Sequence, residues 1–328
     1  MNAKSILLGA VLASSSLFAA TERTGAAAYD DDPNVLSPTN GATLVYKDFY
    51  SGMKCTVPRP DVWNGRYGSH EKNVYHLWLP AGRRAKAPLL LYFHGGGWMG
   101  GNKLDRSLPA TLAYALSNGV AVATANYRFT RDAKASGLVP PVAAPMLDCV
   151  AAVRHFKREA ARWGIDPGRI ALSGGSAGAC SALWVALSNE GEPVCAVGVN
   201  RPQTSLDPQQ MRAWIPNIKY GAHAFGQKDF DAWLANRETL LPSIERFSPI
   251  AQLKTVKVPP KKVFLENTVV EKEGELSRDG THSPRFCLRM KEACDAAGIP
   301  CEILRGGWDE TSRALVDFLI AQPLPQAR

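Results

Sequence analysis

Ser176 is the residue in this sequence best suited to act as a nucleophile. It follows an apolar run and precedes a helical pattern, with Gly174 and Gly178 two residues away on either side. A turn this tight between a strand and a helix leaves no room for side chains at those two positions, and it exposes the serine hydroxyl above the edge of a sheet. The amide of Ala177, at the helix start, then points toward the same space. The spacing therefore predicts nucleophilic chemistry at Ser176, with Ala177 as one donor to an oxyanion.

A glycine-rich loop upstream supplies further donors for the same chemistry. The apolar run Leu89–Phe93 has the length of a strand buried on both faces, and it ends at His-Gly-Gly-Gly-Trp, residues 94–98. Glycines let backbone N–H groups turn inward without obstruction, which an oxyanion requires because its charge develops only in the transition state. We expect the amides of Gly96 and Gly97 to complete the oxyanion hole and Trp98 to contact the substrate.

These two motifs, in this order and each at the end of a strand, resemble the α/β-hydrolase superfamily. The branches that they resemble most are the hormone-sensitive-lipase-like and bacterial feruloyl-esterase-like carboxylesterases, over roughly Val74 to Phe318. The resemblance implies an α/β-hydrolase fold, with a mostly parallel central sheet, helices on both faces and a small lid insertion. It also implies a serine carboxylesterase that uses neither a metal nor an organic cofactor.

The order of elements along the chain agrees with this fold class. Buried strands are expected at 120–125, 194–199, 261–267 and 301–304, and helices at 108–118 and 143–163. Buried strands that alternate with crossover helices predict a parallel sheet, whose ligands gather at the carboxyl ends of the strands.

The 328 residues predict a single domain with additions at its start and in its middle. Residues 1–20 have a lysine followed by a short apolar stretch and small residues, which is typical of a signal peptide, with a retained anchor as the alternative. Residues 21–40 are interpreted as a flexible leader, and 41–328 as the hydrolase domain. An aromatic-rich segment at about 201–247 is the predicted lid, and His223 within it is a candidate substrate contact.

The charge, the apolar N-terminal stretch and the cysteines limit which binding partners and which cellular compartment we expect. The net charge of +8 is spread along the chain without a basic block, so nucleic-acid binding is not expected. The apolar stretch in the signal peptide is too short for stable membrane insertion, and its presence predicts a secreted or periplasmic protein. Export permits disulfides, and the spacing allows Cys294 to pair with Cys301, although the seven cysteines leave connectivity open. The oligomeric state has no signal in the sequence.

The histidine of the expected triad is missing from its usual place. In this superfamily it follows the last strand, but no histidine occurs after His282. The loop before the last helix–strand pair contains Asp279 at the position of the usual acid, and His282 three residues later. We therefore predict His282 as the general base toward Ser176, oriented by Asp279, with Asp309 or Glu310 as alternative acids.

Two functions follow from these residues. The first is an exported serine carboxylesterase that cleaves a small ester or an acylated polysaccharide, with acetyl or feruloyl groups as candidates. The second is a hydrolase-fold binding protein that lacks turnover, as in the gibberellin receptors of plants, which have lost the histidine. The position of His282 relative to Ser176 distinguishes the two.

Overall fold

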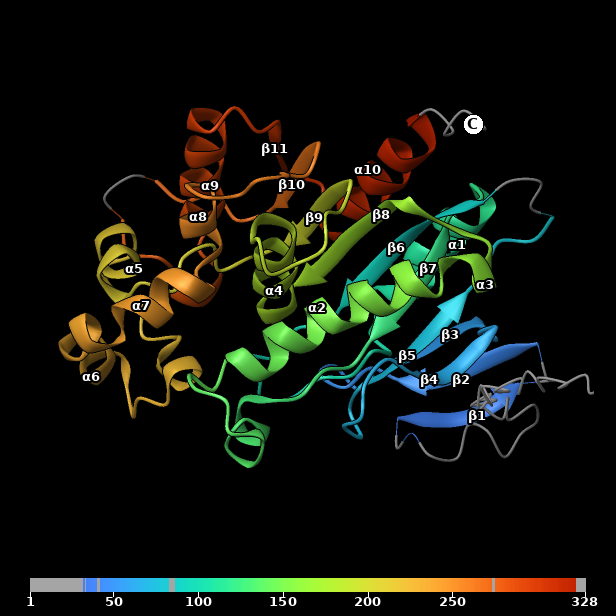
Figure 1. Cartoon of the computed structure of the whole chain (residues 1–328), viewed down its shortest axis with the longest axis horizontal. Coiled ribbons are helices and arrows are strands. Elements are labelled where there is room, and N and C mark those ends of the chain that lie inside the picture. The colour runs from blue at the N-terminus through green and yellow to red at the C-terminus, as the bar shows by residue number, and fades with distance from the viewer. Residues whose placement is uncertain (1–31, 33, 40–41, 83–85, 273–274, 323–328) are drawn as a thin grey trace, which may run out of the picture.

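The centre of the molecule is a sheet with strands in the order β11-β10-β9-β8-β6-β7-β5-β4 (Figure 1). The computed structural model describes residues 32, 34–39, 42–82, 86–272 and 275–322. Strands β6 to β11 pair in parallel, whereas β4 and β5 are antiparallel at one edge. The strands are β4 Val62–Arg66, β5 Val74–Trp78, β6 Ala87–Phe93, β7 Ala121–Ala125, β8 Ile165–Gly175, β9 Ala196–Asn200, β10 Lys262–Glu266 and β11 Cys301–Leu304.

Helices cover both faces of this sheet, as predicted. One face carries α1 Leu108–Ser117 and α10 Trp308–Ala321; the other carries α2 Ala143–Arg158, α4 Ala177–Leu187 and α9 Arg285–Ala296, with the short α3 Ala160–Trp163 after α2. Alternate residues of β6 contact opposite faces: Leu89 and Leu91 belong to the core with α2 and α4, and Leu90 to the core with α1 and α10. All seven residues of β6 are therefore buried, which explains its continuous apolar sequence.

A second, three-stranded antiparallel sheet lies beside the first near the N-terminus. It consists of β1 Val35–Thr39, β2 Thr43–Lys47 and β3 Lys54–Pro58 in that order. The predicted flexible leader, residues 21–40, is wrong at its end. There the residues of β1 pair with β2 instead of remaining free. The predicted signal peptide, residues 1–20, lies outside the described residues.

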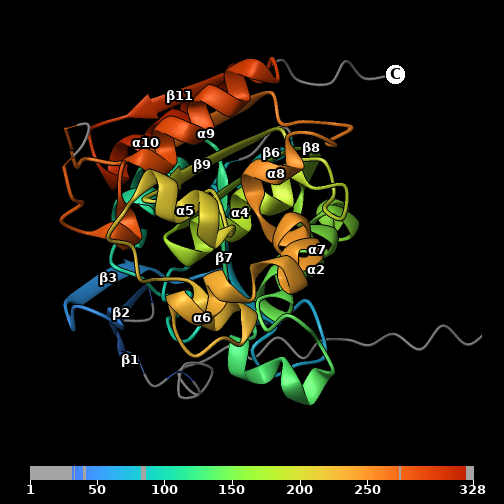
Figure 2. The same cartoon turned by 90° about the vertical axis from the view of Figure 1, so that its left-hand side faces the viewer.

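The segment between β9 and β10 is helical and contains the predicted lid. Its elements are α5 Pro208–Trp214, η4 Ala222–Phe225, α6 Phe230–Ala235, α7 Arg237–Phe247 and α8 Pro249–Gln252. Helices α5, α6 and α7 lie at the left-hand end of Figure 1 and face the viewer in Figure 2. Several of its aromatic residues are buried and belong to the core on the α2 and α4 face of the sheet, where Phe225 stacks on Trp233 with ring centroids 5.2 Å apart. The aromatic content that suggested a lid is thus largely internal packing.

Short 3₁₀ turns complete the chain: η2 Thr130–Asp132, η3 Lys134–Ser136 and η5 Gly280–His282. All seven cysteines are free thiols, so the suggested Cys294–Cys301 pairing is not formed. Within the described ranges, no helix has both the length and the apolar character needed to cross a bilayer. In the same residues no His, Cys, Asp or Glu side chains cluster as metal ligands would.

Candidate active site

Ser176 occupies a strained turn between β8 and α4. Its φ of 52° and ψ of −117° lie in a region that residues with a side chain rarely adopt. The flanking glycines make this turn possible. A Cβ on Gly174 would lie 2.6 Å from the carbonyl carbon of Gly178, and a Cβ on Gly178 would lie 2.2 Å from the carbonyl oxygen of Phe93. The predicted requirement for small residues on both sides is confirmed by these close approaches.

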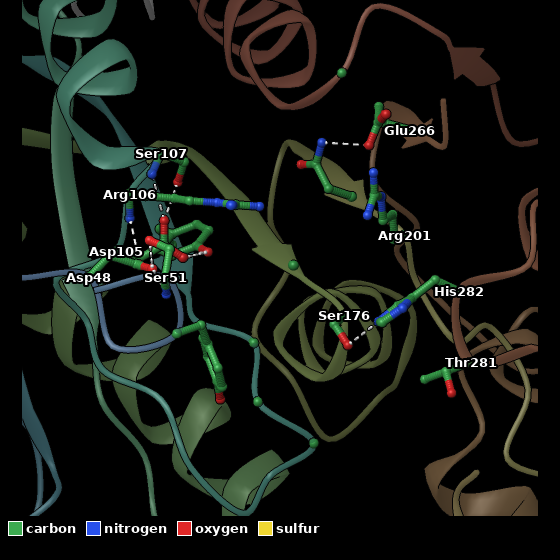
Figure 3. A pocket seen from close by; sticks show the side chains of 18 of the residues that line it. Asp48, Ser51, Asp105, Arg106, Ser107, Ser176, Arg201, Glu266, Thr281 and His282 are labelled. Carbon is green, nitrogen blue, oxygen red and sulfur yellow. Dashed lines mark hydrogen bonds between the residues drawn. The ribbon is translucent and has the colours of Figure 1, made fainter. Parts of the chain in front are cut away.

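His282 lies in a loop after β10 and hydrogen-bonds to Ser176, which follows β8. Its Nε2 lies 2.9 Å from Ser176 Oγ (Figure 3). Its Nδ1 lies 2.8 Å from Asp279 Oδ2. The second oxygen of Asp279 accepts the backbone amides of Thr281 and His282, which fixes the carboxylate against the turn η5. With the Nδ1 proton directed at Asp279, Nε2 is free to accept the serine proton. The structure thus brings together the three residues predicted for the triad.

The acid in this arrangement is Asp279, and its charge is stabilised by the histidine. Burial raises the pKa of the Asp279 carboxyl, but the hydrogen bond and the charge of His282 outweigh that effect and hold the pKa below its usual value. Asp309 lies at the cavity wall, and Glu310 accepts the amide of Gly306. Among the described contacts neither of these two carboxylates bonds to His282.

Two buried amide side chains hold the loop that carries His282. Asn267 Nδ2 donates to the carbonyl of His282 at 2.8 Å, and Gln203 Nε2 donates to the carbonyl of Thr281 at 2.6 Å. Both side chains follow strands of the central sheet and are fully buried. The imidazole therefore reaches the serine from the loop after β10, so the absence of a histidine after β11 does not leave Ser176 without a base.

The glycine loop after β6 has a backbone conformation that favours glycine. Gly96 and Gly97 have φ values of 117° and 61°, and a Cβ on Gly96 would lie 2.0 Å from Tyr50 Oη. The amides of Gly96, Gly97 and Ala177 donate to no other group in the described part of the chain, which leaves all three available. The carbonyl of Gly95 contacts His94 Nδ1 at 2.7 Å, so His94 braces this loop.

Trp98 and His223 have different roles from the predicted substrate contacts. The Trp98 indole is fully buried and donates to Ser181 Oγ at 2.9 Å, because the loop turns it into the core beneath the glycines. His223 Nε2 donates to the carbonyl of Gly97 at 2.7 Å. Neither side chain lines the cavity beside Ser176. Both support the glycine loop from behind.

A cavity of about 830 Å³ opens above Ser176 and His282. Much of its wall comes from residues that the sequence did not single out: Asp48, Tyr50, Ser51 and Met53 between β2 and β3, and Asp105, Arg106 and Ser107 before α1. The position of these two segments beside the serine depends on how the two sheets pack. Of the predicted lid, only Arg201 and Tyr220 reach the cavity.

The two carboxylates of this wall are occupied by internal partners. Asp105 accepts the hydroxyl of Tyr92 at 2.7 Å and the amide of Ser107 at 2.8 Å. Asp48 accepts the amides of Ser51 and Arg106. These acids therefore build the wall, and they have little capacity left to bind a ligand.

A hydrogen-bonded Ser–His–Asp set at the carboxyl edge of a mostly parallel sheet, with a glycine loop beside the serine, defines an α/β-hydrolase. The chain belongs to the BD-FAE family, whose sequence profile matches residues 75–260. The resemblance drawn from the two motifs is thereby confirmed.

Known proteins agree with this assignment. Carboxylesterase NlhH of Mycobacterium tuberculosis is 33% identical over 134 residues, which cover 40% of this chain and 40% of that protein. A truncated carbohydrate esterase from gut microbiota superposes with a TM-score of 0.57 at 19% identity, over 78% of this chain and 93% of the other. Esterase 2 of Thermogutta terrifontis gives a TM-score of 0.57 at 20% identity, over 78% and 90% of the two chains. The structural matches show the shared fold.

Proposed function

We propose that the protein is a serine carboxylesterase that works through an acyl-enzyme. The observation that carries the proposal is the chain of hydrogen bonds from Ser176 through His282 to Asp279. In the first step Ser176 Oγ attacks the ester carbonyl while His282 Nε2 takes its proton. The tetrahedral intermediate then collapses, and the alcohol leaves with the proton from His282. Water, activated by the same imidazole, attacks the acyl-enzyme, and the acid is released as Ser176 regains its proton.

The backbone supplies the electrostatic part of this mechanism. The free amides of Gly96, Gly97 and Ala177 are the donors proposed for the oxyanion, each worth about 3 kcal/mol of transition-state stabilisation in sites of this kind. The strained turn and the glycine conformations hold these amides in place before the substrate binds, so no reorganisation is needed during the reaction.

The substrate is proposed to be a small ester or an acylated polysaccharide, acetyl and feruloyl groups being the candidate acyl parts. A structural relative is described as a carbohydrate esterase, which supports this class. Export is part of the proposal and follows from the signal-peptide pattern of residues 1–20. Sequencing the N-terminus of protein secreted by an expressing cell tests it, since retention of residues 1–20 in soluble cytoplasmic protein would contradict export.

Hydrolysis of p-nitrophenyl acetate tests the chemistry. We expect Ser176→Ala and His282→Ala each to lower kcat by at least about 10³-fold. Labelling with an aryl phosphate triester should add one phosphoryl group to Ser176, detected by mass spectrometry of the tryptic peptide. Ser117→Ala, an exposed serine at the end of α1, is the control and should retain wild-type activity. Turnover that survives in Ser176→Ala, or absence of turnover by the wild-type chain on every ester, would refute the proposal.

A further inference from the structure

Two neighbouring polar side chains at the ends of β9 and β10 line the cavity without using all their hydrogen-bonding atoms. Asn200 and Glu266 lie opposite each other in the parallel register of the two strands, and each retains only 2% exposure. Both line the cavity that contains Ser176. The carbonyl of Asn200 also accepts the amide of Ser176 at 2.9 Å, so this pair is attached directly to the nucleophile turn.

Hydrogen bonds to Asn200 and Glu266 leave one oxygen of each without a partner. Asn200 Nδ2 donates to Glu266 Oε2 at 2.9 Å and to Thr311 Oγ1 at 3.2 Å, so both of its N–H groups are used. Asn200 Oδ1 and Glu266 Oε1 are buried with no partner in the described residues. A buried polar atom without a partner is costly, and such atoms are rare in folded proteins. Two of them side by side at a cavity wall indicate that a bound molecule supplies the missing groups.

The surroundings favour a neutral hydroxyl group over a cation. Burial raises the pKa of the Glu266 carboxyl above its usual value, despite the opposing hydrogen bond from Asn200 and charge of Arg201. The guanidinium groups of Arg201 and Arg106 line the same cavity, and Figure 3 shows Arg201 beside Glu266. A hydroxyl group both donates and accepts, so it can pair with the amide oxygen and with the carboxyl in either protonation state.

The backbone around this pair is organised as at other functional sites. Arg201, directly after Asn200, has a φ of 48° in the left-handed region, and its amide donates to the carbonyl of Glu266 at 2.8 Å. A left-handed non-glycine residue stores strain, which persists where the surrounding structure imposes it and which is common at ligand sites. At Arg201 this left-handed conformation turns the backbone at the point where the side chains of Asn200 and Glu266 meet the cavity.

We propose that Asn200 and Glu266 form a subsite for hydroxyl groups, and that it binds the polyhydroxylated alcohol part, a sugar residue, of the ester cleaved at Ser176. This inference rests on the proposed esterase function and adds the two residues that bind the alcohol part of the substrate. Because Asn200 is bonded to the backbone of Ser176, a sugar joined directly to the scissile oxygen lies within reach of the pair.

The first test compares two acetate esters that differ in the alcohol: p-nitrophenyl acetate, which has no hydroxyl group, and a mono-O-acetylated methyl β-xylopyranoside. The measured quantity is the ratio of kcat/KM for the sugar ester to that for the aryl ester. Glu266→Met, which keeps the length of the side chain but removes its polar atoms, should lower this ratio at least tenfold. Glu266→Gln, which keeps an acceptor oxygen, should lower it by less than threefold.

The matched control is Glu302→Met, the same replacement on the neighbouring strand β11. Glu302 pairs with Lys262 at 2.9 Å and lies outside the cavity wall, so the ratio should equal that of the wild type. An unchanged ratio in a folded Glu266→Met protein would overturn the subsite, and it is the result expected if an ordered water molecule satisfies the two oxygens.

A second test uses only the wild-type chain, so it does not depend on the folding of a variant. Removing one sugar hydroxyl at a time from the acetylated xyloside should lower kcat/KM at least tenfold at one position, because the deoxy substrate leaves a buried acceptor unpaired. Equal rates for every deoxy analogue would overturn the proposal. Acetylcholine is the cationic comparison, and a kcat/KM for it above that of the sugar ester would replace the hydroxyl subsite with a cation subsite.

A binding measurement distinguishes failure of the hydroxyl subsite from failure of the proposed esterase function. In Ser176→Ala, titration with methyl β-xylopyranoside followed by NMR should give saturable shifts, and adding Glu266→Met should weaken the affinity at least tenfold. If the wild-type chain cleaves no ester but this binding difference appears, the subsite stands and the esterase proposal fails. If aryl esters are cleaved and no sugar binding is detected, the esterase proposal stands and the subsite fails.

Discussion

Asp279 orients His282 from a more open position than the acid of a buried triad. Its side chain retains 53% exposure, whereas that of His282 retains 26%. Three hydrogen bonds keep the carboxylate in place despite this exposure, one from the imidazole and two from the backbone amides of the η5 turn. Water can reach such an acid and replace part of its effect on the imidazole.

The exposure of Asp279 sets the expected effect of its removal. Asp279→Asn should lower kcat for p-nitrophenyl acetate by about 10²-fold, less than the ~10⁴-fold loss known for a buried triad acid, because solvent can still stabilise the imidazolium. Steady-state kinetics of purified protein measure this loss. An equal or larger loss in Asp309→Asn, with Asp279→Asn near wild type, would assign the acid to Asp309.

His223 acts at the residue scale through the carbonyl of Gly97. His223→Leu removes this donor and should lower kcat about tenfold for every ester, because a loosened glycine loop weakens oxyanion binding whatever the alcohol. His223→Gln keeps a donor and should recover part of the activity. A change confined to the KM of one substrate class would instead indicate that His223 contacts the substrate.

At the scale of elements, the site depends on how closely β6, β8 and α4 approach one another. Helix α4 is buried along its whole length, and Gly178 allows its first turn to rest on the backbone at the end of β6. The same contact brings the glycine loop beside Ser176. The packing of three elements therefore decides the distance between the nucleophile and its oxyanion donors.

Gly178→Ala tests this packing. The added Cβ would lie 2.2 Å and 2.4 Å from the carbonyl oxygens of Phe93 and His94, so we expect a loss of about 1–3 kcal/mol in the free energy of unfolding, with a large loss of activity. Thermal unfolding and ester hydrolysis measure the two effects. Gly168→Ala is the control, since its Cβ would meet only Asp166 at 3.4 Å. Equal stability and activity of Gly178→Ala and the wild type would contradict this account of the turn.

At the scale of the whole molecule, the small antiparallel sheet completes the cavity that the large sheet begins. The turn between β2 and β3 supplies part of the wall, and Tyr46 Oη donates to the carbonyl of Asp105 at 2.7 Å. Lys103 Nζ pairs with Asp32 Oδ2 at 3.2 Å, with both residues buried, which ties the chain just before β1 to the loop after β6. The turn between β2 and β3 is thus part of the site, and the N-terminal strands position it.

Buried histidines make the stability of the whole fold depend on pH. Burial lowers the pKa values of His94 and His155 to about 4 each, below the value of about 6.5 in an unfolded chain. Between these values the unfolded state binds more protons, so the stability that the neutral histidines contribute is present above about pH 6.5 and is lost as pH falls toward 4. Denaturant unfolding at several pH values measures this loss.

Replacing one histidine measures how much of this pH dependence of stability that residue causes. His94→Gln should reduce the decrease in unfolding free energy between pH 6.5 and 4 by an amount on the order of 3 kcal/mol. A pH dependence identical to that of the wild type would show that His94 does not titrate in this range.

The sequence by itself determined the parts of this protein that are local. The requirement for Gly174 and Gly178 arises within a few residues of Ser176, and the apolar run of β6 follows from burial on both faces, so the elbow, the glycine loop and the parallel sheet were predictable. Asp279 and His282 are three residues apart, and this spacing allowed their pairing to be predicted too. Their hydrogen bonds within one turn are local interactions of the same kind.

Only the tertiary structure decided which distant groups share the cavity. The indole of Trp98 turns into the core while Tyr50, nearly fifty residues earlier, reaches the glycine loop, because side-chain direction at a loop is set by the elements packed behind it. The same holds for Asn200 and Glu266, which become neighbours through the register of β9 with β10. Strand register and packing are long-range properties, and no short stretch of sequence contains them.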